Sequence, residues 1–367
     1  MHHERFLSID AFRGLAVAAM LLVNNPGSWS QVYPPMRHAA WHGWTFTDLI
    51  FPFFLFIVGM VIPFSFGRRM REGMPTSGLV SKVLKRSAVI FLLGFFLNLF
   101  PSFDFSSVRI PGVLQRIALG YLAGALICLK TKPAGRIALS IVLLAGYTAL
   151  LRFVPVPGFG TGILEPSGNL PGYVDAKLLA GHLLRPDFDP EGLLSTIPAV
   201  VTVLLGTMLG DWLRSARTIV RKTLGVFSAG IPLAAIGLFL HPYLPINKSL
   251  WTASYVLFTA GMALIVFGLC FVLIDGFGWK HWAWPFLVVG SNPITVFVGS
   301  ALLGKVLLVI KIPDGGAAVN PVVWLHGHFF APVAGPVLGS LIYAVLFVLL
   351  WIVLMAPLHK HRLFLKI

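Results

Sequence analysis

The sequence has few charged residues, and acidic residues are the scarcest of them. Of its 367 residues, 11% are charged, whereas ordinary soluble domains carry about 25%. Thirteen Asp and Glu stand against 28 Lys and Arg, which gives a formal net charge of +15. A chain this apolar is not intrinsically disordered. It also has too little polar surface to cover the core of a soluble enzyme.

Cysteine is also scarce, and the common metal and nucleotide motifs are missing. The two cysteines, Cys128 and Cys270, lie in apolar runs, so the sequence does not predict a disulfide framework. No HExxH, CxxC or Walker motif is present. The HGH at 326–328 is a weak hint of a metal site, because no third ligand is near in the sequence. We therefore expect no metal cofactor.

Long apolar runs are what the sequence has in abundance. Hydrophobic residues make up 57%, and the mean hydropathy is +0.86. A transmembrane helix needs about 20 mostly apolar residues. Ten segments fit: 7–25, 47–66, 83–100, 110–129, 136–153, 195–212, 223–240, 251–274, 286–309 and 336–357. The sequence thus predicts an all-α integral membrane protein, a polytopic bundle of about ten transmembrane helices forming a single domain over 1–367.

Two local features bear on these helices. Asp10 and Arg13 interrupt the first segment, which could instead be a secretory signal peptide, although no A-x-A cleavage site follows it. The GxxxG patterns at 120–124, 206–210 and 335–339 predict helices that pack closely.

The distribution of basic residues predicts the orientation. If the N-terminus is cytoplasmic, the inner segments hold 18 Lys and Arg and the outer segments hold 8. Cytoplasmic loops collect basic residues, so we expect both termini in the cytoplasm. The basic charge then reflects orientation and contact with anionic lipid headgroups of the bilayer. Nucleic-acid binding is not expected, because the chain has no soluble basic domain.

The longest connection, 154–194, lies on the predicted outer side between the fifth and sixth helices. It is rich in Gly and Pro and carries most of the acidic side chains of the outer loops: Glu165, Asp175, Asp187, Asp189 and Glu191. Loops of this length are usually functional or disordered. Two alternatives are open, a folded cover over an outward-facing site and a solvated connector.

Polar residues gather where the first four helices are expected to reach the outer surface. They are Asn24, Asn25, His38, His42, Asp48, Asn98, Gln115 and Arg116. An imidazole near a carboxylate, at a site shielded by the membrane, suits general-base or nucleophilic chemistry at neutral pH. The simpler alternatives are a helix cap for Asp48 and a packing ion pair for Arg116.

A second set of polar residues is expected on the inner side. Asp10 and Arg13 are three residues apart and can share a helix face, close to the basic residues that follow the second helix. This set reflects either orientation alone or an anion site for a phosphorylated cytosolic ligand. Asn292 precedes Pro293 in GSNPI, and we expect the ninth helix to break there and expose backbone groups to a cavity.

Six blocks of sequence resemble the heparan-α-glucosaminide N-acetyltransferase family. They are RFLSIDAFRG at 5–14, VNN at 23–25, HAAWHGWTFTDLIFPFFLFIVG at 38–59, RIPGVLQR at 109–116, DPEGLLSTI at 189–197 and GSNPI at 290–294. The blocks run in order through nearly the whole chain. The animal lysosomal members carry an extra N-terminal luminal region and one further helix, and we expect this chain to be a bacterial-type member without them.

The resemblance implies a transmembrane acetyltransferase. Cytosolic acetyl-CoA would supply the acetyl group, and the acceptor would be the amino group of a glucosamine-type sugar on the outer side. The catalytic histidine of the family matches His38, the asparagine after the first helix matches Asn24, and the acid of TxxDL matches Asp48. His42 stands where the animal enzymes have asparagine, so the resemblance gives it no central role.

The remaining expectations concern binding and location. We expect donor or acceptor contacts from Arg13, Arg116, Gln115, Glu191 and Asn292. The resemblance suggests a bacterial inner membrane with His38 facing the exterior, and it leaves a homodimer open as an oligomeric state.

Several alternatives remain at this stage. His38 could accept the acetyl group itself or deprotonate the acceptor for direct attack. The natural acceptor, and whether transfer is to nitrogen or oxygen, stay open. The other classes considered are a transporter or flippase for a polar or sugar-linked substrate and a membrane scaffold without activity.

Overall fold

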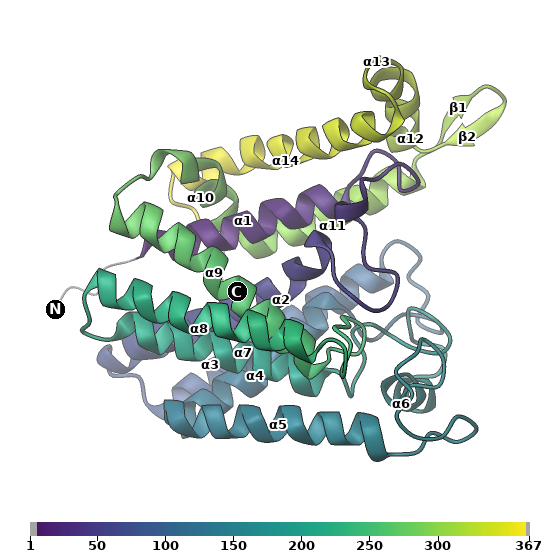
Figure 1. Ribbon diagram of the computed structural model, residues 1–367. Helices are drawn as coiled ribbons and strands as arrows, with labels where there is room; N and C mark the ends of the chain where they lie inside the picture. The colour runs from purple at the N-terminus through teal and green to yellow at the C-terminus, as the bar shows by residue number, and fades with distance from the viewer. Residues whose placement is uncertain (1–5, 365–367) are drawn as a thin grey trace.

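Long helices lie side by side in the computed structural model, which describes residues 6–364 (Figure 1). The long unbroken helices are α1 (Leu7–Asn24), α2 (Phe46–Arg71), α3 (Thr76–Leu99), α4 (Val113–Lys130), α5 (Pro133–Phe153), α7 (Thr196–Arg214), α8 (Ile219–Leu240), α9 (Ala253–Phe271) and α14 (Pro336–Lys360). A bent pair, α10 (Trp284–Gly290) and α11 (Pro293–Val309), completes the set. Each of the ten predicted segments therefore corresponds to a helix or to this pair.

The chain is an all-α integral membrane protein by the length and composition of these helices. Within residues 6–364, eight helices are long and apolar enough to cross a membrane, or nine if the bent pair is one span. α3 is long enough as well, but Lys82, Lys85 and Arg86 make it less apolar than the others. α1 packs against α2, α9, α10 and α14, so it is part of the bundle.

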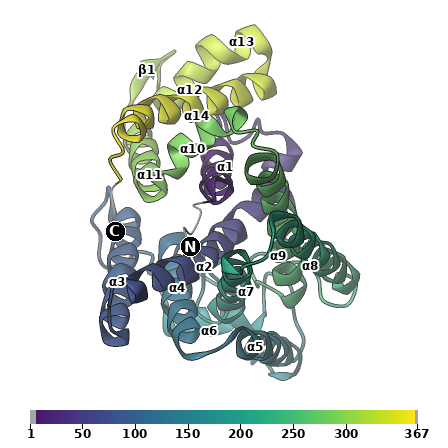
Figure 2. The ribbon, with the colours of Figure 1, turned by 90° about the vertical axis from the view of Figure 1, so that its left-hand side faces the viewer.

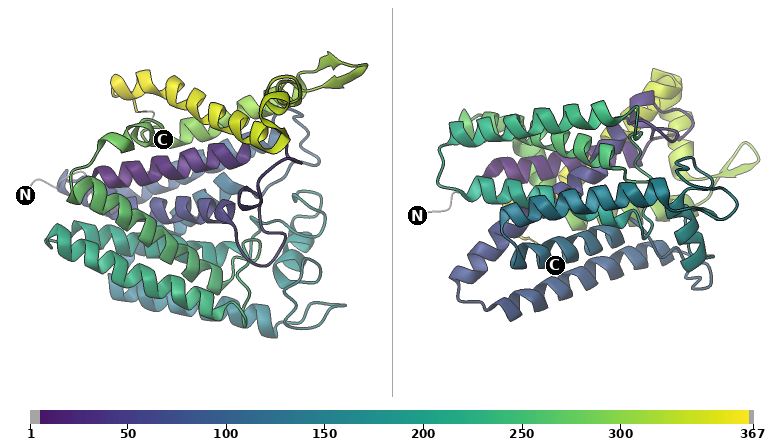
Figure 3. Two further views of the ribbon diagram at one scale, coloured as in Figure 1. Left: turned by 45° about the horizontal axis from the view of Figure 1, so that its top comes forward. Right: turned by 60° about the horizontal axis from the view of Figure 1, so that its bottom comes forward.

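Short elements complete the described fold. They are α6 (Leu170–Leu178), α12 (Pro321–Leu325), α13 (Ala331–Ala334), a few single turns, and an antiparallel hairpin of β1 (Ile312–Asp314) and β2 (Ala317–Val319). In Figure 1, α6 and the hairpin lie at the right, at the end of the bundle opposite the N-terminus. We call this the loop end, since segments 25–45, 154–195 and 241–252 also meet there (Figure 3).

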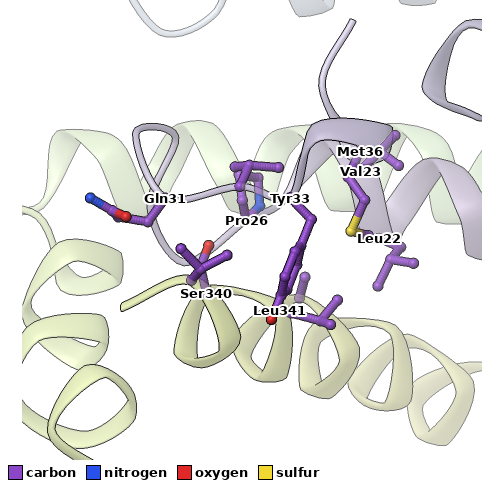
Figure 4. A pocket seen from close by; sticks show the side chains of 11 residues that line it. Leu22, Val23, Pro26, Gln31, Tyr33, Met36, Ser340 and Leu341 are labelled. Atoms are coloured by element: carbon purple, nitrogen blue, oxygen red, sulfur yellow. The ribbon is translucent and has the colours of Figure 1, made fainter. Parts of the chain in front are cut away.

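Two apolar cores hold the helices together. The larger core lies among α2, α3, α4, α7 and α9. The smaller core joins α1 to α10, α11 and α14, which form a separate group at the top of Figure 2. A small apolar pocket lies between segment 22–36 and α14, and Tyr33 and Leu341 line it (Figure 4).

Glycine brings α2 and α7 into backbone contact. A Cβ atom on Gly206 would lie 2.1 Å from the carbonyl oxygen of Phe56, and one on Gly210 would lie 2.3 Å from that of Met60. Gly120 and Gly124 of α4 likewise face Val203 of α7. Close packing at these two GxxxG patterns is confirmed. In the third, Gly339 packs on Phe330, whereas Gly335 adopts a φ of +80° in open space.

The predicted break at Asn292 is confirmed. α10 and α11 meet at an angle of 70°, and Pro293 opens α11 because its missing N–H is not needed in a first helical turn. Gly290, before the break, packs directly on the backbone of Asp10 and Gly14 in α1. The bend thus joins α1 to the group that contains α14.

Segment 154–194 is a folded part of the loop end. It contains α6, and Asn169, Asp175 and Phe188 are buried in it. Trp41 donates a hydrogen bond to the Leu164 carbonyl at 2.7 Å, and its ring meets Phe188 edge-on at 5.3 Å. Of the two alternatives, the folded segment is therefore the observed one, and it rests on the segment that carries His38.

Candidate active site

His38 and Asp48 form a hydrogen-bonded pair at the loop end. Nδ1 of His38 lies 2.7 Å from Oδ1 of Asp48. The carboxylate is 2% exposed and the imidazole is 54% exposed. An ionised carboxylate only accepts hydrogen bonds, so Nδ1 carries the proton. In the neutral imidazole Nε2 then carries the lone pair, which is the form required of a base or nucleophile.

Asp48 is fixed by the start of α2. Its Oδ2 accepts the backbone N–H groups of Ala39 at 3.0 Å and Thr45 at 3.1 Å. Thr45 is the N-cap of α2, with Asp48 in a capping box. The hydroxyl of Tyr255, from α9, donates to the backbone carbonyl of Asp48 at 2.6 Å. The carboxylate is thus both a helix cap and the partner of His38.

Lys248 is the third charged group of this cluster. Its Nζ lies 3.2 Å from Nδ1 and 3.4 Å from Nε2 of His38, and 3.8 Å from Oδ1 of Asp48. Burial lowers the pKa of the Lys248 ammonium, against the opposing attraction of Glu191 and Asp48. In the sequence Lys248 is only one of the basic loop residues, because nothing local connects it with His38.

Arg116 is a buried guanidinium beneath this region. Its Nη2 donates to the Gly192 carbonyl at 3.0 Å and to the Ser195 hydroxyl at 2.5 Å. Its Cζ lies 5.1 Å from the ring centre of Trp251. Nε and Nη1 find no hydrogen-bond partner in the part of the chain that the structure describes. Buried donors of this kind usually have a partner, so Arg116 retains two donors for a ligand.

Arg109 joins two of the recognised sequence blocks. It holds Asp189 through two hydrogen bonds, at 2.8 and 2.6 Å, and reaches Glu191 at 2.5 Å. Burial alone would lower the pKa of Arg109, but the hydrogen bond to Asp189 and the charge of Glu191 raise it overall. The predicted site residue Glu191 is thus held by Arg109, which was not among the predicted site residues although both lie in blocks that resemble the family.

The predicted site residues fall into two groups. Near the His38–Asp48 pair, both Glu191 and Arg116 act electrostatically on Lys248. Gln115 is buried beside Gly94 and Gly112, and its Nε2 has no partner among the described residues.

Asn24 makes no hydrogen bond with the His38–Asp48 pair in the described part of the chain. It is exposed at the end of α1, and its side chain makes no hydrogen bond to residues 6–364. The structure therefore brings His38, Asp48, Glu191 and Arg116 into one region and leaves Asn24 without a hydrogen bond to them.

Arg13 and Asn292 lie at the opposite end of the bundle. Arg13 pairs with Asp10 at 3.2 Å and approaches the Gly290 carbonyl at 3.4 Å. Asn292 caps α11 and donates to the Leu363 carbonyl at 3.1 Å. A cavity of about 520 Å³ opens beside them, lined by Leu7, Asp10, Leu287, Ser291, His359, Arg362 and Phe364. This end therefore offers a cavity of mixed apolar and polar lining, bordered by a guanidinium, an imidazole and the carboxylate of Asp10.

The HGH segment has structural contacts. His326 is buried with Nε2 2.9 Å from the Pro336 carbonyl, and His328 has Nδ1 3.0 Å from the Trp324 carbonyl. Across residues 6–364, no three His, Cys, Asp or Glu side chains are placed to hold a metal ion.

Comparisons with known proteins connect these residues to one family. Residues 5–245 match the family described as "Heparan-alpha-glucosaminide N-acetyltransferase, catalytic". The chain is 31% identical over 356 residues to the human heparan-alpha-glucosaminide N-acetyltransferase, a match that covers 80% of this chain and 52% of the human protein. It is 30% identical over 358 residues to the mouse protein, covering 82% and 54%. The chain thus spans about half the length of these relatives.

Proposed function

The chain belongs to the heparan-α-glucosaminide N-acetyltransferase family, and on that basis we propose that it is a membrane acetyltransferase. It would move an acetyl group from acetyl-CoA to the amino group of a glucosamine-type sugar. The observation that carries this proposal is the 2.7 Å contact between His38 and the buried Asp48, which leaves Nε2 of His38 available.

Both chemical routes use the same nitrogen. In direct transfer, the acceptor amine attacks the thioester carbonyl, Nε2 takes the amine proton, and the C–S bond breaks to release the CoA thiolate. In covalent transfer, Nε2 attacks first and the thiolate leaves. The amine then displaces the imidazole from the acetyl group, and the released Nε2 takes the amine proton. Asp48 supports both routes, because it fixes the tautomer and stabilises the positive charge that develops on the ring.

Arg116 and Gln115 support binding of an oxygen-rich group. Both are buried and keep donors without a partner in the described chain. A sugar hydroxyl, or the oxyanion of the tetrahedral intermediate, is the kind of acceptor that such donors need. Asn24 belongs to the proposed site through the family motif. Its exposed amide is free to meet a substrate that approaches from the loop end.

The donor would enter from the opposite end. The cavity beside Arg13 and Asn292 would take the phosphate groups through Arg362, which lines it, and through Arg13, which also pairs with the lining carboxylate of Asp10. The connections at the end of the bundle where α1 begins hold the excess of basic residues. This excess supports a cytoplasmic location for that end. On this view His38 faces the exterior, and the membrane would be a bacterial inner membrane.

The direct test is acetyl transfer by the purified wild-type protein. Radiolabelled acetyl-CoA and glucosamine should give N-acetylglucosamine, whose identity can be checked by mass spectrometry. Glycerol serves as an acceptor that has hydroxyl groups but no amine. Absence of transfer to every amine tested would overturn the proposal.

A transporter or flippase is the second candidate, favoured by the 70° break between α10 and α11. Donor binding separates the two classes. If the protein is an acetyltransferase, millimolar CoA and acetyl-CoA should raise its thermal midpoint, because a ligand that binds only the folded state stabilises it. Free acetate should not. No shift with either CoA compound would favour the transporter.

A further inference from the structure

Lys248 follows the region matched by the family model and lies beside the proposed catalytic histidine. The family match ends at residue 245, and Lys248 follows in the connection between α8 and α9. Its side chain is 19% exposed, and its Nζ lies within 3.4 Å of both ring nitrogens of His38. In sequence the two residues are 210 positions apart. The contact needs an explanation, because a cation and an imidazole do not attract each other once the imidazole is protonated.

The backbone around Lys248 is firmly placed. The side chain of Asn247 is fully buried and donates to the Trp41 carbonyl at 3.0 Å. Its Oδ1 accepts the N–H of Leu250 at 2.8 Å, and its own N–H donates to the Thr252 hydroxyl at 3.2 Å. These bonds tie the α8–α9 connection to the segment that carries His38. The ammonium is therefore held beside the imidazole by buried contacts.

Two charges of opposite sign face His38. Asp48 approaches from α2 and favours the imidazolium, whereas Lys248 approaches from the α8–α9 connection and disfavours it. The other titratable side chains on the segment that carries His38 bind elsewhere. Arg37 donates to the carbonyls of Val32 and Ser30. His42 meets Asn247 at 3.3 Å and Glu165 at 3.5 Å.

More distant charges act on Lys248 itself. Those of Glu191 and Arg116 reach its ammonium with opposite signs. Asp48 and Lys248 are thus the charged groups in contact with the His38 ring among residues 6–364.

We infer that Lys248 is a positioning residue that keeps the imidazole of His38 neutral, with Nε2 unprotonated, in the presence of the Asp48 carboxylate. A buried carboxylate 2.7 Å away would by itself stabilise the imidazolium, which can act neither as a base nor as a nucleophile. The ammonium offsets this effect and leaves Asp48 free to hold the ring. The inference rests on the proposed function for its purpose, but the charge state of His38 can be measured without any acetyl transfer.

The test is the pH dependence of His38 modification by diethyl pyrocarbonate, which reacts with neutral imidazole. The chain has 11 histidines, so tandem mass spectrometry must follow the peptide that contains His38. Removing a charge about 3 Å away should move the midpoint of this reaction by about 1 pH unit or more. Lys248→Met should therefore shift the midpoint to higher pH. Lys248→Arg keeps the charge and should restore a midpoint close to that of the wild type.

Two controls isolate the contact. Lys177→Met removes a charge from α6, where Lys177 lies over the ring of Tyr173, and should leave the midpoint of His38 unchanged. Asp48→Asn should lower the midpoint, because the opposite charge is removed. Lys248→Gln provides a second neutral variant if the methionine variant does not fold. An unchanged midpoint in a folded neutral variant would overturn the inference.

The outcome stays distinguishable from that of the proposed function. Modification is measured without donor or acceptor, so a shifted midpoint stands even if the wild type transfers no acetyl group. Where transfer does occur, Lys248→Met should lower kcat/KM most at acidic and neutral pH and recover part of it at alkaline pH. A loss that is equal at every pH would indicate a merely structural role.

Discussion

At the scale of single residues, Asp48 divides two tasks between its two oxygens. Oδ2 accepts backbone N–H groups at and before the start of α2, and Oδ1 accepts a hydrogen bond from Nδ1–H of His38. The sequence offered the helix cap and the dyad as alternatives. Both are present, because a carboxylate has enough acceptor positions for a cap and an imidazole at once.

His38→Ala should reduce acetyl transfer by about 100-fold or more while acetyl-CoA still binds. General-base and nucleophilic roles contribute at least that much, and a group used mainly in the transition state affects turnover more than donor affinity. The measurements are turnover with labelled acetyl-CoA and thermal stabilisation by the donor. Asp48→Asn should be milder if Asp48 only orients the ring.

His42→Ala is the matched control for His38→Ala. His42 sits four residues away and contacts Asn247 and Glu165 instead of Asp48. Its removal should leave turnover near that of the wild type. If His42→Ala loses activity and His38→Ala keeps it, the assignment of the catalytic histidine is wrong.

Asp175→Asn should change how stability depends on pH. Asp175 is buried in α6, and its Oδ2 has no partner in the part of the chain described. Burial raises the pKa of this carboxyl to about 6, from an ordinary value of about 3.9. Its contribution to stability is therefore fully present below about pH 4 and is lost as the pH rises through 6. In Asp175→Asn the amide does not ionise, so this loss of stability with rising pH is absent.

The measurement is thermal unfolding of both proteins at pH 4.5 and pH 7.5. Relative to the wild type, Asp175→Asn should be more stable at pH 7.5 than at pH 4.5. Asp187→Asn, an exposed position in the same segment, should show no such trend. Equal differences at the two pH values would contradict the assigned ionisation of Asp175.

At the scale of elements, helix contacts depend on the absence of side chains. α2 and α7 touch through Gly59, Gly206 and Gly210, where each added Cβ would meet a backbone carbonyl oxygen. Such contacts are typical of helices that associate in lipid, where dispersion between closely packed backbones replaces the hydrophobic effect. Gly192 and Ser195, the partners of Arg116, directly precede α7. A change in this packing is therefore expected to reach the site.

Gly206→Ala tests the contact with a single methyl group. The new Cβ would lie 2.1 Å from the Phe56 carbonyl oxygen, so α2 and α7 must separate. Overpacking of this kind costs about 1–3 kcal/mol, which a lower thermal midpoint would report. Gly146→Ala in α5 is the control, because nothing lies within 4 Å of the added atom. It should be neutral or slightly stabilising, and a similar loss in both variants would refute the explanation.

At the scale of the whole molecule, the two polar clusters lie at opposite ends of one bundle. α1 begins and α14 ends at the end that carries Arg13 and Asn292 (Figure 1). His38, Asp48 and Lys248 lie at the loop end. The proposed transfer from a cytoplasmic donor to an acceptor on the other side needs sites that are separated in this way.

Cysteine labelling tests the orientation. After replacement of Cys128 and Cys270, single cysteines at Gln31 and Ser167 should react with an impermeant reagent added outside intact cells. Cysteines at Thr76 and Arg217 should react only after the membrane is permeabilised, because they lie in the segments with the basic excess. Outside labelling at Thr76 would reverse the orientation and place His38 on the cytoplasmic side.

The sequence by itself determined the membrane class, the ten helical segments, the break at Asn292 and the pairing of His38 with Asp48. These features are local: apolar runs, a proline after an asparagine, and two residues ten positions apart across a helix start. Only the tertiary structure decided which residues from remote parts of the sequence join the candidate site. Arg109 meets Asp189 across 80 positions and Lys248 meets His38 across 210, whereas Asn24, close to His38 in sequence, forms no hydrogen bond with it among the described residues. Such contacts depend on how whole helices pack, and no local pattern carries that information.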